Sequence, residues 1–233
     1  MNYSSAKKEL FSIVKQVKAY INAEKDSGTE EFFIHGGISP KKDASPDQSK
    51  TRLLFQIRQR VSGCEKCALF KTRTNIVFGD GDPDAKLLFV GEAPGADEDA
   101  QGLPFVGKAG KLLTKMIEAM GLSRGSVYIC NVLKCRPPEN RSPLPEEVSA
   151  CGQYLLDQID IISPKVICCL GRHATQALLK TEAPISKIRG KRLDLNGVAL
   201  VPTFHPAYLL RNPSAKKEAW EDLKKINKIL SEG

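Results

Sequence analysis

The sequence predicts an α/β fold, a three-layer αβα sandwich around a central, mainly parallel four-stranded sheet. Three observations lead to this prediction. Four apolar, strand-like runs lie between residues 87 and 204, helical patterns separate them, and a polar loop rich in Gly or Pro follows each run. Strands that alternate with helices favour parallel pairing, with helices covering both faces of the sheet.

The first 50 residues are predicted to lie outside this sandwich. Apolar residues recur at helical spacing over residues 10–21, which predicts a short amphipathic helix. Residues 26–50 mix Gly, Pro, Ser and charges without a period, which is typical of a flexible linker. We therefore predict two parts: an N-terminal helix and linker over residues 1–50, and the main domain over residues 51–233.

Within the domain, apolar residues three and four positions apart predict helices, and continuous apolar runs predict strands. The predicted helices cover residues 53–61, 107–120, 145–162, 172–180 and 215–230. The predicted strands cover residues 87–90, 127–132, 166–171 and 198–204.

Composition limits the class of protein. The formal net charge of +8 suits a polyanionic partner, because Lys and Arg release counterions when they neutralise phosphates; a basic surface without nucleic acid is the alternative. Seven irregularly placed cysteines favour reduced thiols over a disulfide scaffold. The sequence shows no apolar leader and no stretch of about 20 apolar residues, so we expect an intracellular, cytoplasmic protein with no membrane partner.

Four cysteines are candidate ligands. Cys64 and Cys67 form a CxxC pair at the end of a predicted helix, and Cys135 and Cys151 flank a proline-rich loop. Four thiolates that meet at one centre suit either zinc or an iron–sulfur cluster, and the spacing alone favours zinc. The remaining cysteines lie in apolar strands, where free cysteine behaves as a small hydrophobic residue: Cys130, Cys168 and Cys169.

The loops that follow the strands carry long motifs. These are GEAPGADED (91–99), GLPFVGKAG (102–110), NVLKCRPPENR (131–141), GRHAT (171–175) and HPAYLLR (205–211). Ligands of parallel sheets collect at the carboxyl ends of the strands, so these loops are expected to form the functional site. Four of these motifs, all except GRHAT, taken in order over residues 52–230, resemble the type 4 uracil-DNA glycosylases, a branch of the uracil-DNA glycosylase superfamily that carries a 4Fe–4S cluster.

The resemblance implies an enzyme of base excision repair that flips uracil out of single- or double-stranded DNA and hydrolyses its glycosidic bond, leaving an abasic site. It also implies a structural 4Fe–4S cluster in place of zinc, with no redox step. The implied ligands are Cys64, Cys67, Cys135 and Cys151. We expect a monomer.

The same resemblance implies roles in base binding. Phe105 is the expected stacking platform, although the residue alone suits an ordinary core phenylalanine. Asn131 is expected to match the N3–H donor and O4 acceptor of uracil, with a turn-forming role as the alternative. Asn140 is the weaker candidate. Gly91 and Ala93 complete the base-binding loop, and another branch of the superfamily has an aspartate in place of Ala93.

Excision builds negative charge on uracil O2 and positive charge on the sugar. His205, before a proline in the loop after a strand, is expected to donate a hydrogen bond to the departing oxygen. Glu98 is the first choice for positioning a water and stabilising the sugar. Glu92 is the second, with an expected steric role against the methyl group of thymine.

Four arginines and two leucines are expected to contact DNA. The expected phosphate ligands are Arg136, Arg141, Arg172 and Arg211. Leu209 and Leu210 are candidates to fill the gap left by the extruded base, with packing in the core as the alternative.

Two rival functions remain. The first is a noncatalytic DNA-binding module of the same fold, stabilised by a cluster or zinc. The second is a nucleotide-binding enzyme, which ranks last because GEAPG has neither the GKS/T ending of a P-loop nor the GxGxxG order. The loop CRPPENR carries no inserted histidine, so we expect turnover and no covalent trapping of DNA.

Overall fold

The computed structural model describes residues 48–232, and the predicted N-terminal helix lies outside this range. The first described helix, α2, spans Gln48–Ser62, so the last three residues of the predicted linker are helical. No helix within the described range has the length and apolar character needed to cross a membrane. The predicted boundary at residue 50 remains a prediction.

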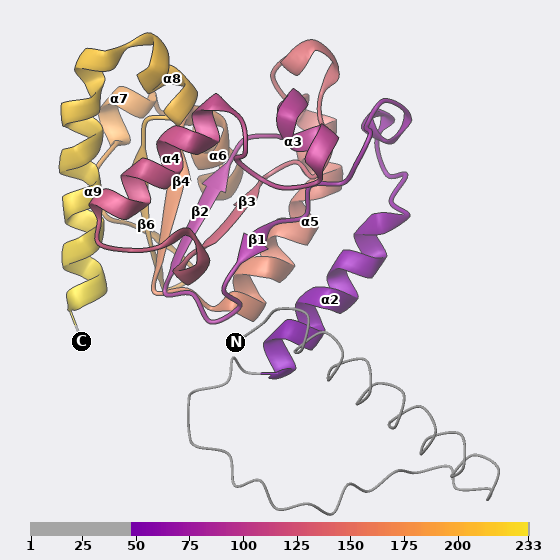
Figure 1. Cartoon of the computed structure of the whole chain (residues 1–233), viewed down its shortest axis with the longest axis horizontal. Coiled ribbons are helices and arrows are strands. Elements are labelled where there is room, and N and C mark those ends of the chain that lie inside the picture. Colours follow the sequence, from indigo (N-terminus) through magenta and orange to yellow (C-terminus); the bar gives the residue numbers. More distant parts are fainter. Residues whose placement is uncertain (1–47, 233) are drawn as a thin grey trace, which may run out of the picture. The chain divides into compact units, whose positions relative to one another are not determined.

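The described part contains one six-stranded sheet with the order β1-β3-β2-β4-β6-β5 (Figure 1). The strands are β1 (Asp80–Gly81), β2 (Leu87–Gly91), β3 (Tyr128–Asn131), β4 (Val166–Leu170), β5 (Leu193–Leu195) and β6 (Val198–Thr203). The inner four pair in parallel, as predicted. The antiparallel edge strands β1 and β5 are additions to the predicted sheet.

The edge strand β5 had a sequence signal that the strand prediction missed. It joins β6 through Asn196 and Gly197, which both adopt positive φ angles, 52° and 91°. Asn-Gly between apolar runs is the strongest short-range indication of a β-hairpin, because both residues tolerate this backbone conformation. The two-residue strand β1 is too short to carry a comparable pattern.

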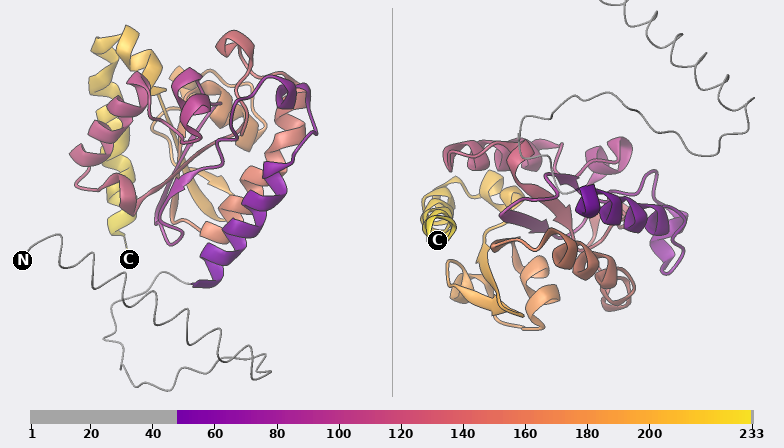
Figure 2. Two further views of the ribbon diagram at one scale, coloured as in Figure 1. Left: turned by 45° about the vertical axis from the view of Figure 1, so that its right-hand side comes forward. Right: turned by 90° about the horizontal axis from the view of Figure 1, so that it is seen from below.

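Helices cover both faces of the sheet (Figure 2). After α2 come α3 (Ala96–Gln101), α4 (Lys108–Ala119), α5 (Pro145–Ile162), α6 (Arg172–Leu179), α7 (Ile185–Ile188), α8 (Pro206–Arg211) and α9 (Lys216–Ser231). One core lies between the sheet and α4 and α9, and the other lies between the sheet and α2, α5 and α6. The three-layer sandwich is confirmed, and the five predicted helices are all present.

Alternating side chains on the central strands fill the two cores. On β2, Leu87 and Phe89 contribute to the core under α4 and α9, while Leu88 and Val90 contribute to the core under α5 and α6. Successive side chains of a strand point to opposite faces, so a parallel strand covered on both sides is apolar throughout. The three strand cysteines are buried in these cores, and burial raises the pKa of each thiol, which leaves them neutral.

The parallel arrangement brings the carboxyl ends of four strands to one rim of the sheet. Gly91 at the end of β2 lies beside Asn131 at the end of β3. On the other side, the backbone N–H of Gly171, just after β4, donates to the carbonyl of Thr203 at the end of β6. The short helices α3 and α8 lie at this rim (Figure 1).

Candidate active site

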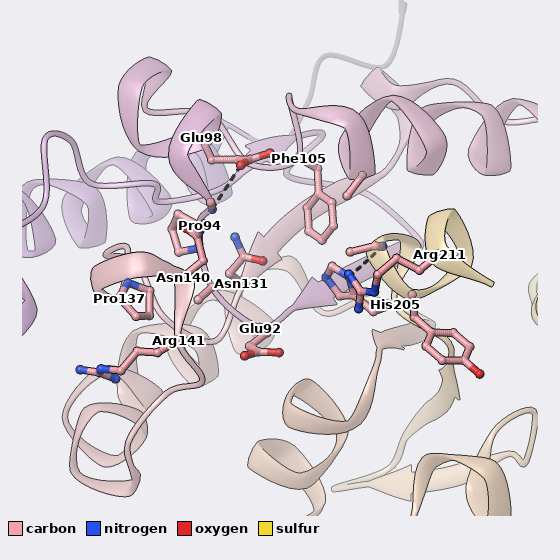
Figure 3. A pocket seen from close by; sticks show the side chains of 15 residues that line it. Glu92, Pro94, Glu98, Phe105, Asn131, Pro137, Asn140, Arg141, His205 and Arg211 are labelled. Atoms are coloured by element: carbon pink, nitrogen blue, oxygen red, sulfur yellow. Dashed lines mark hydrogen bonds between the residues drawn. The ribbon is translucent and has the colours of Figure 1, made fainter. Parts of the chain in front are cut away.

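A pocket of about 460 Å³ opens at this rim (Figure 3). The predicted base-binding residues Ala93, Phe105, Asn131 and Asn140 line it. So do the predicted catalytic residues Glu92, Glu98 and His205, and the arginines Arg141 and Arg211. The fold therefore brings together residues that lie more than 110 positions apart in the sequence.

Asn131 lies at the base of this pocket and has an unsatisfied acceptor. Its side chain is 1% exposed, and its Oδ1 accepts no hydrogen bond from any described residue. A buried polar atom without a partner costs about 1–3 kcal/mol, so a donor is expected to complete it. Gly91 makes this arrangement possible, because a Cβ there would lie 2.3 Å from Asn131 Oδ1 and 2.5 Å from Phe105 Cζ.

Phe105 is held in place by its backbone. Its φ of 51° is unusual for a non-glycine residue, and Arg124 donates to the carbonyls of both Phe105 and Pro104. Gly110 allows α4 to begin directly against this loop, because a Cβ there would lie 1.9 Å from the Phe105 carbonyl oxygen. The ring lines the pocket beside His205, with the ring centroids 5.7 Å apart.

Glu98 is engaged with the backbone on both carboxylate oxygens. Its Oε1 accepts from the N–H groups of Val106 and Gly107, each at 2.9 Å, and its Oε2 accepts from the N–H of Gly95 at 3.2 Å. These bonds cap α3 and tie it to the loop that carries Phe105. The geometry therefore favours a role in holding the pocket wall over the predicted role in positioning water.

His205 is presented to the pocket as a neutral imidazole. Its Nδ1 accepts from the backbone N–H of Ala207 at 3.1 Å, which caps α8. Burial, and to a smaller extent the nearby guanidinium of Arg211, lowers the pKa of His205 to about 4. A neutral ring that accepts at Nδ1 carries its proton on Nε2, so a donor remains for a ligand.

The two carboxylate oxygens of Glu92 differ: one contacts a histidine, and the other has no partner among the described residues. Its Oε2 lies 2.6 Å from Nδ1 of His173, and no described residue donates to its Oε1. The prediction of site residues missed His173, which is the second residue of α6. The loop GRHAT, which follows a central strand, was the available signal.

The predicted DNA-contacting arginines differ in availability. Arg211 lines the pocket and is exposed. Arg141 forms two hydrogen bonds with Glu147, at 2.9 and 2.6 Å, which offsets part of its charge. Arg136 donates through Nε to Asn140 Oδ1 at 2.9 Å, so this amide oxygen at the exposed rim is already used. Arg172 is exposed and contacts His173.

One predicted DNA contact is corrected by the structure. Leu209 is only 1% exposed, because α8 packs it into a small core with Phe204 and Ala219. Its neighbour Leu210 is 43% exposed and is the leucine on α8 that presents an apolar surface. The helical turn separates the two adjacent side chains by about 100° around the axis, so only one of them can face the core.

A second cavity is lined by four cysteines, Cys64, Cys67, Cys135 and Cys151. Arg73 donates to the sulfur of Cys135 at 3.4 Å, and the backbone N–H of Lys134 donates to the sulfur of Cys151 at 3.3 Å. Within residues 48–232, no group of three His, Cys, Asp or Glu side chains is arranged to hold a single metal ion. Four converging sulfurs with N–H donors are a donor set that fits a cubane cluster, which takes one thiolate per iron.

Lys134 connects the cysteine cavity with the pocket. It is 1% exposed, and its ammonium donates to the backbone carbonyl of Asn131 at 2.8 Å and to Gln158 Oε1. Among the described residues it forms no ion pair with a carboxylate. A buried ammonium is costly without a counter-charge, and thiolates in the adjoining cavity would supply one.

Comparison with known proteins agrees with this geometry. The sequence pattern of the Uracil DNA glycosylase superfamily matches residues 78–224. A Type-4 uracil-DNA glycosylase of Thermotoga maritima is 46% identical over 186 residues, covering 78% of this chain and 97% of the relative. The one from Sulfurisphaera tokodaii is 49% identical over 185 residues, covering 76% and 84%. That of Archaeoglobus fulgidus is 47% identical over 184 residues, covering 76% and 92%. The chain therefore belongs to the uracil-DNA glycosylase superfamily, among its type 4 members.

Proposed function

We infer that this protein is a DNA glycosylase that removes uracil from DNA by hydrolysing the N-glycosidic bond, which leaves an abasic site for base excision repair. The names of its relatives support this activity. The observation that carries it is the buried, unpartnered Oδ1 of Asn131 in a pocket that also holds Phe105 and His205.

The pocket suits the edge of a flipped-out uracil. Asn131 Oδ1 would accept the N3–H of uracil, and the amide nitrogen of the same side chain would donate to O4. Cytosine presents an acceptor at N3 and a donor at N4, so it would leave the buried oxygen unsatisfied. Phe105 would stack on the base and offset part of the stacking lost when the nucleotide leaves the helix.

His205 suits the departing oxygen. A neutral imidazole with its proton on Nε2 can donate a hydrogen bond to uracil O2 as negative charge develops there. A donor that is already oriented by the Ala207 N–H needs little reorganisation during the reaction, which is the main source of electrostatic stabilisation.

Glu92 is the carboxylate that best fits the sugar side of the reaction. Its free Oε1 can accept a hydrogen bond from a water and can stabilise the positive charge on the sugar. Glu98, whose two oxygens already accept from three backbone N–H groups, would act by holding the Phe105 loop. The predicted steric role of Glu92 against thymine stays a prediction.

The rim would hold the DNA backbone. Arg211, Arg136, Arg141 and Arg172 would contact phosphates, and Arg141 is the least available of them because it is paired with the Glu147 carboxylate. Leu210, exposed on α8 next to Arg211, would fill the gap in the base stack.

We also propose that Cys64, Cys67, Cys135 and Cys151 hold a 4Fe–4S cluster. Their shared cavity, the N–H donors to two of the sulfurs and the buried ammonium of Lys134 support this assignment. The cluster would cross-link the segment after α2, the helix α5 and the loop after β3, and hydrolysis of a glycosidic bond calls for no electron transfer.

The test is excision of uracil from labelled single- and double-stranded oligonucleotides, followed by alkali to cleave abasic sites. We expect cleavage at uracil and none at cytosine or thymine in matched oligonucleotides. Asn131→Ala should lower kcat/KM by about 10- to 100-fold, the cost of one lost buried hydrogen-bonding group. Asn140→Ala is the matched control, because Arg136 already occupies its oxygen.

The outcomes separate the rival functions. Uracil-DNA binding without alkali-labile sites would replace the enzyme by a noncatalytic DNA-binding module. Equal losses in Asn131→Ala and Asn140→Ala would remove Asn131 from its assigned place in base recognition.

A further inference from the structure

We infer that His173 is a positioning residue that orients Glu92 in the active site, so that one carboxylate oxygen stays directed at the water and the sugar. This inference rests on the proposed function. It adds to that function a residue of α6 that does not itself line the uracil pocket.

His173 and Glu92 follow neighbouring strands of the sheet and lie in close contact. Glu92 directly follows β2, and His173 lies two residues after the loop position Gly171 that follows β4; β2 and β4 are hydrogen-bonded neighbours. His173 Nδ1 lies 2.6 Å from Glu92 Oε2. This distance is slightly shorter than the range of about 2.7–2.9 Å typical of charge-assisted N–H···O contacts, so the two side chains are in direct contact.

The neighbouring arginine determines which nitrogen of His173 donates. Arg172 Nη2 lies 3.0 Å from His173 Nε2. A guanidinium can only donate, so Nε2 accepts. The proton of a neutral His173 is then on Nδ1, the nitrogen that lies 2.6 Å from Glu92 Oε2. The three side chains therefore form a series of contacts from Arg172 through His173 to Glu92, in which the nitrogen that carries the proton lies beside the carboxylate.

The helix that carries His173 is fixed to the same frame as His205. Gly171, which precedes α6, has its N–H bonded to the carbonyl of Thr203 and its carbonyl bonded to the hydroxyl of Thr175. Gly171 has a φ of 90°, and a Cβ there would lie 2.9 Å from the Cβ of His205. The start of α6, which carries His173, is therefore fixed directly beside His205 at the end of β6.

The carboxylates of Glu98 and Glu92 differ in the number of groups that hold them. Backbone N–H groups hold both oxygens of Glu98, whereas Glu92 has His173 as its partner among the described residues. Without it, the three rotatable side-chain bonds of Glu92 would be free to turn the carboxylate toward solvent. The catalytic group would remain present but would spend less time in the reactive orientation.

The experiment compares His173→Ala, His173→Asn, Glu92→Gln and the double variant His173→Ala/Glu92→Gln. Asparagine is the rescue variant, because its amide N–H reaches the position of Nδ1. Gln176→Ala, on the same helix, is the matched control. The readouts are the single-turnover excision rate, the affinity for an oligonucleotide with a non-hydrolysable uracil nucleotide, and the melting temperature.

We expect His173→Ala to slow single-turnover excision by about tenfold or more while the affinity changes less than about twofold, since an orientation effect acts on the chemical step. His173→Asn should recover most of the rate, and Gln176→Ala should match the wild type. The double variant should be no slower than Glu92→Gln, because His173 acts through Glu92.

Three results would overturn the inference: wild-type rates in His173→Ala, a rate loss in the double variant equal to the product of the single losses, or no rescue by His173→Asn at an unchanged melting temperature. Wild-type protein that does not excise uracil would instead overturn the proposed function, and the role of His173 with it. Excision by the wild type together with any of the three results overturns the role of His173 alone.

Discussion

The proposed uracil pocket and the cysteine cavity adjoin the two ends of one short segment, residues 131–135, and each lacks a different kind of partner. The pocket has an unpaired neutral acceptor, Asn131 Oδ1. The cavity is flanked by Lys134, a buried cation without a described carboxylate partner. A missing donor points to a polar, uncharged ligand, and a missing anion points to a charged one. This difference supports the two proposals, a base in the pocket and a thiolate-bound cluster in the cavity.

The two sites also differ in which atoms accept the hydrogen bonds from the surrounding protein. In the pocket, backbone N–H groups orient His205 and Glu98 before any ligand arrives. In the cavity, the guanidinium of Arg73 and the backbone N–H of Lys134 donate to sulfur atoms. Substitutions in the pocket should therefore change rates without changing the spectrum, and substitutions in the cavity should change the spectrum first.

The largest effect is expected at His205. His205→Ala should lower the rate of uracil excision by about 100-fold or more, as expected when one oriented donor to a developing oxyanion is lost. Absorbance near 400 nm, expected from the proposed thiolate-bound cluster, should stay at the wild-type level. A single-turnover assay and a visible spectrum measure both; a rate within threefold of wild type would remove His205 from the leaving-group role.

Among substitutions in the cysteine cavity, Cys135→Ala should have the largest effect on iron content. Loss of one of the four sulfurs should lower the iron content and the visible absorbance, and should reduce the yield of soluble protein. Cys130→Ala, in an apolar strand, is the control and should retain its iron. Equal iron in both variants would exclude Cys135 from the ligand set.

Lys134→Met should have a smaller effect, but it should change both cluster loading and DNA binding. Methionine keeps much of the length but removes the charge, so cluster loading should fall. The carbonyl of Asn131 would also lose its hydrogen bond, which should weaken binding of uracil-containing DNA by several-fold. Iron analysis and fluorescence anisotropy measure the two effects. Wild-type values in both would refute a link between the cavity and the pocket through Lys134.

The smallest effect concerns stability against pH. Burial lowers the pKa of His205 from 6.5 to about 4, so the unfolded chain takes up this proton at a higher pH than the folded chain. The contribution to stability is complete above pH 6.5 and is lost progressively as the pH falls towards 4. Melting temperatures between pH 7 and pH 4 should fall more steeply for the wild type than for His205→Asn. Parallel curves would mean that His205 is not buried as a neutral ring.

Most of the fold and much of the site could be predicted from local patterns. The four inner strands and five of the helices carry apolar patterns of the expected period, and their alternation predicts parallel pairing, while the order of the strands comes from the structure. The edge strand β5 was missed although its Asn196–Gly197 turn was visible, because three residues carry too little alternation to be noticed alone.

The chain itself determined the sandwich, the rim at which the loops gather, the family and the meeting of four distant cysteines, because these follow from periodicity and from long motifs in order. Only the tertiary structure decided which of two neighbouring leucines faces solvent, which of two glutamates has a free oxygen, and that His173 reaches Glu92. Burial and hydrogen bonding depend on atoms supplied by segments far away in the sequence. A local pattern names the candidate residues, but packing determines which of them can act.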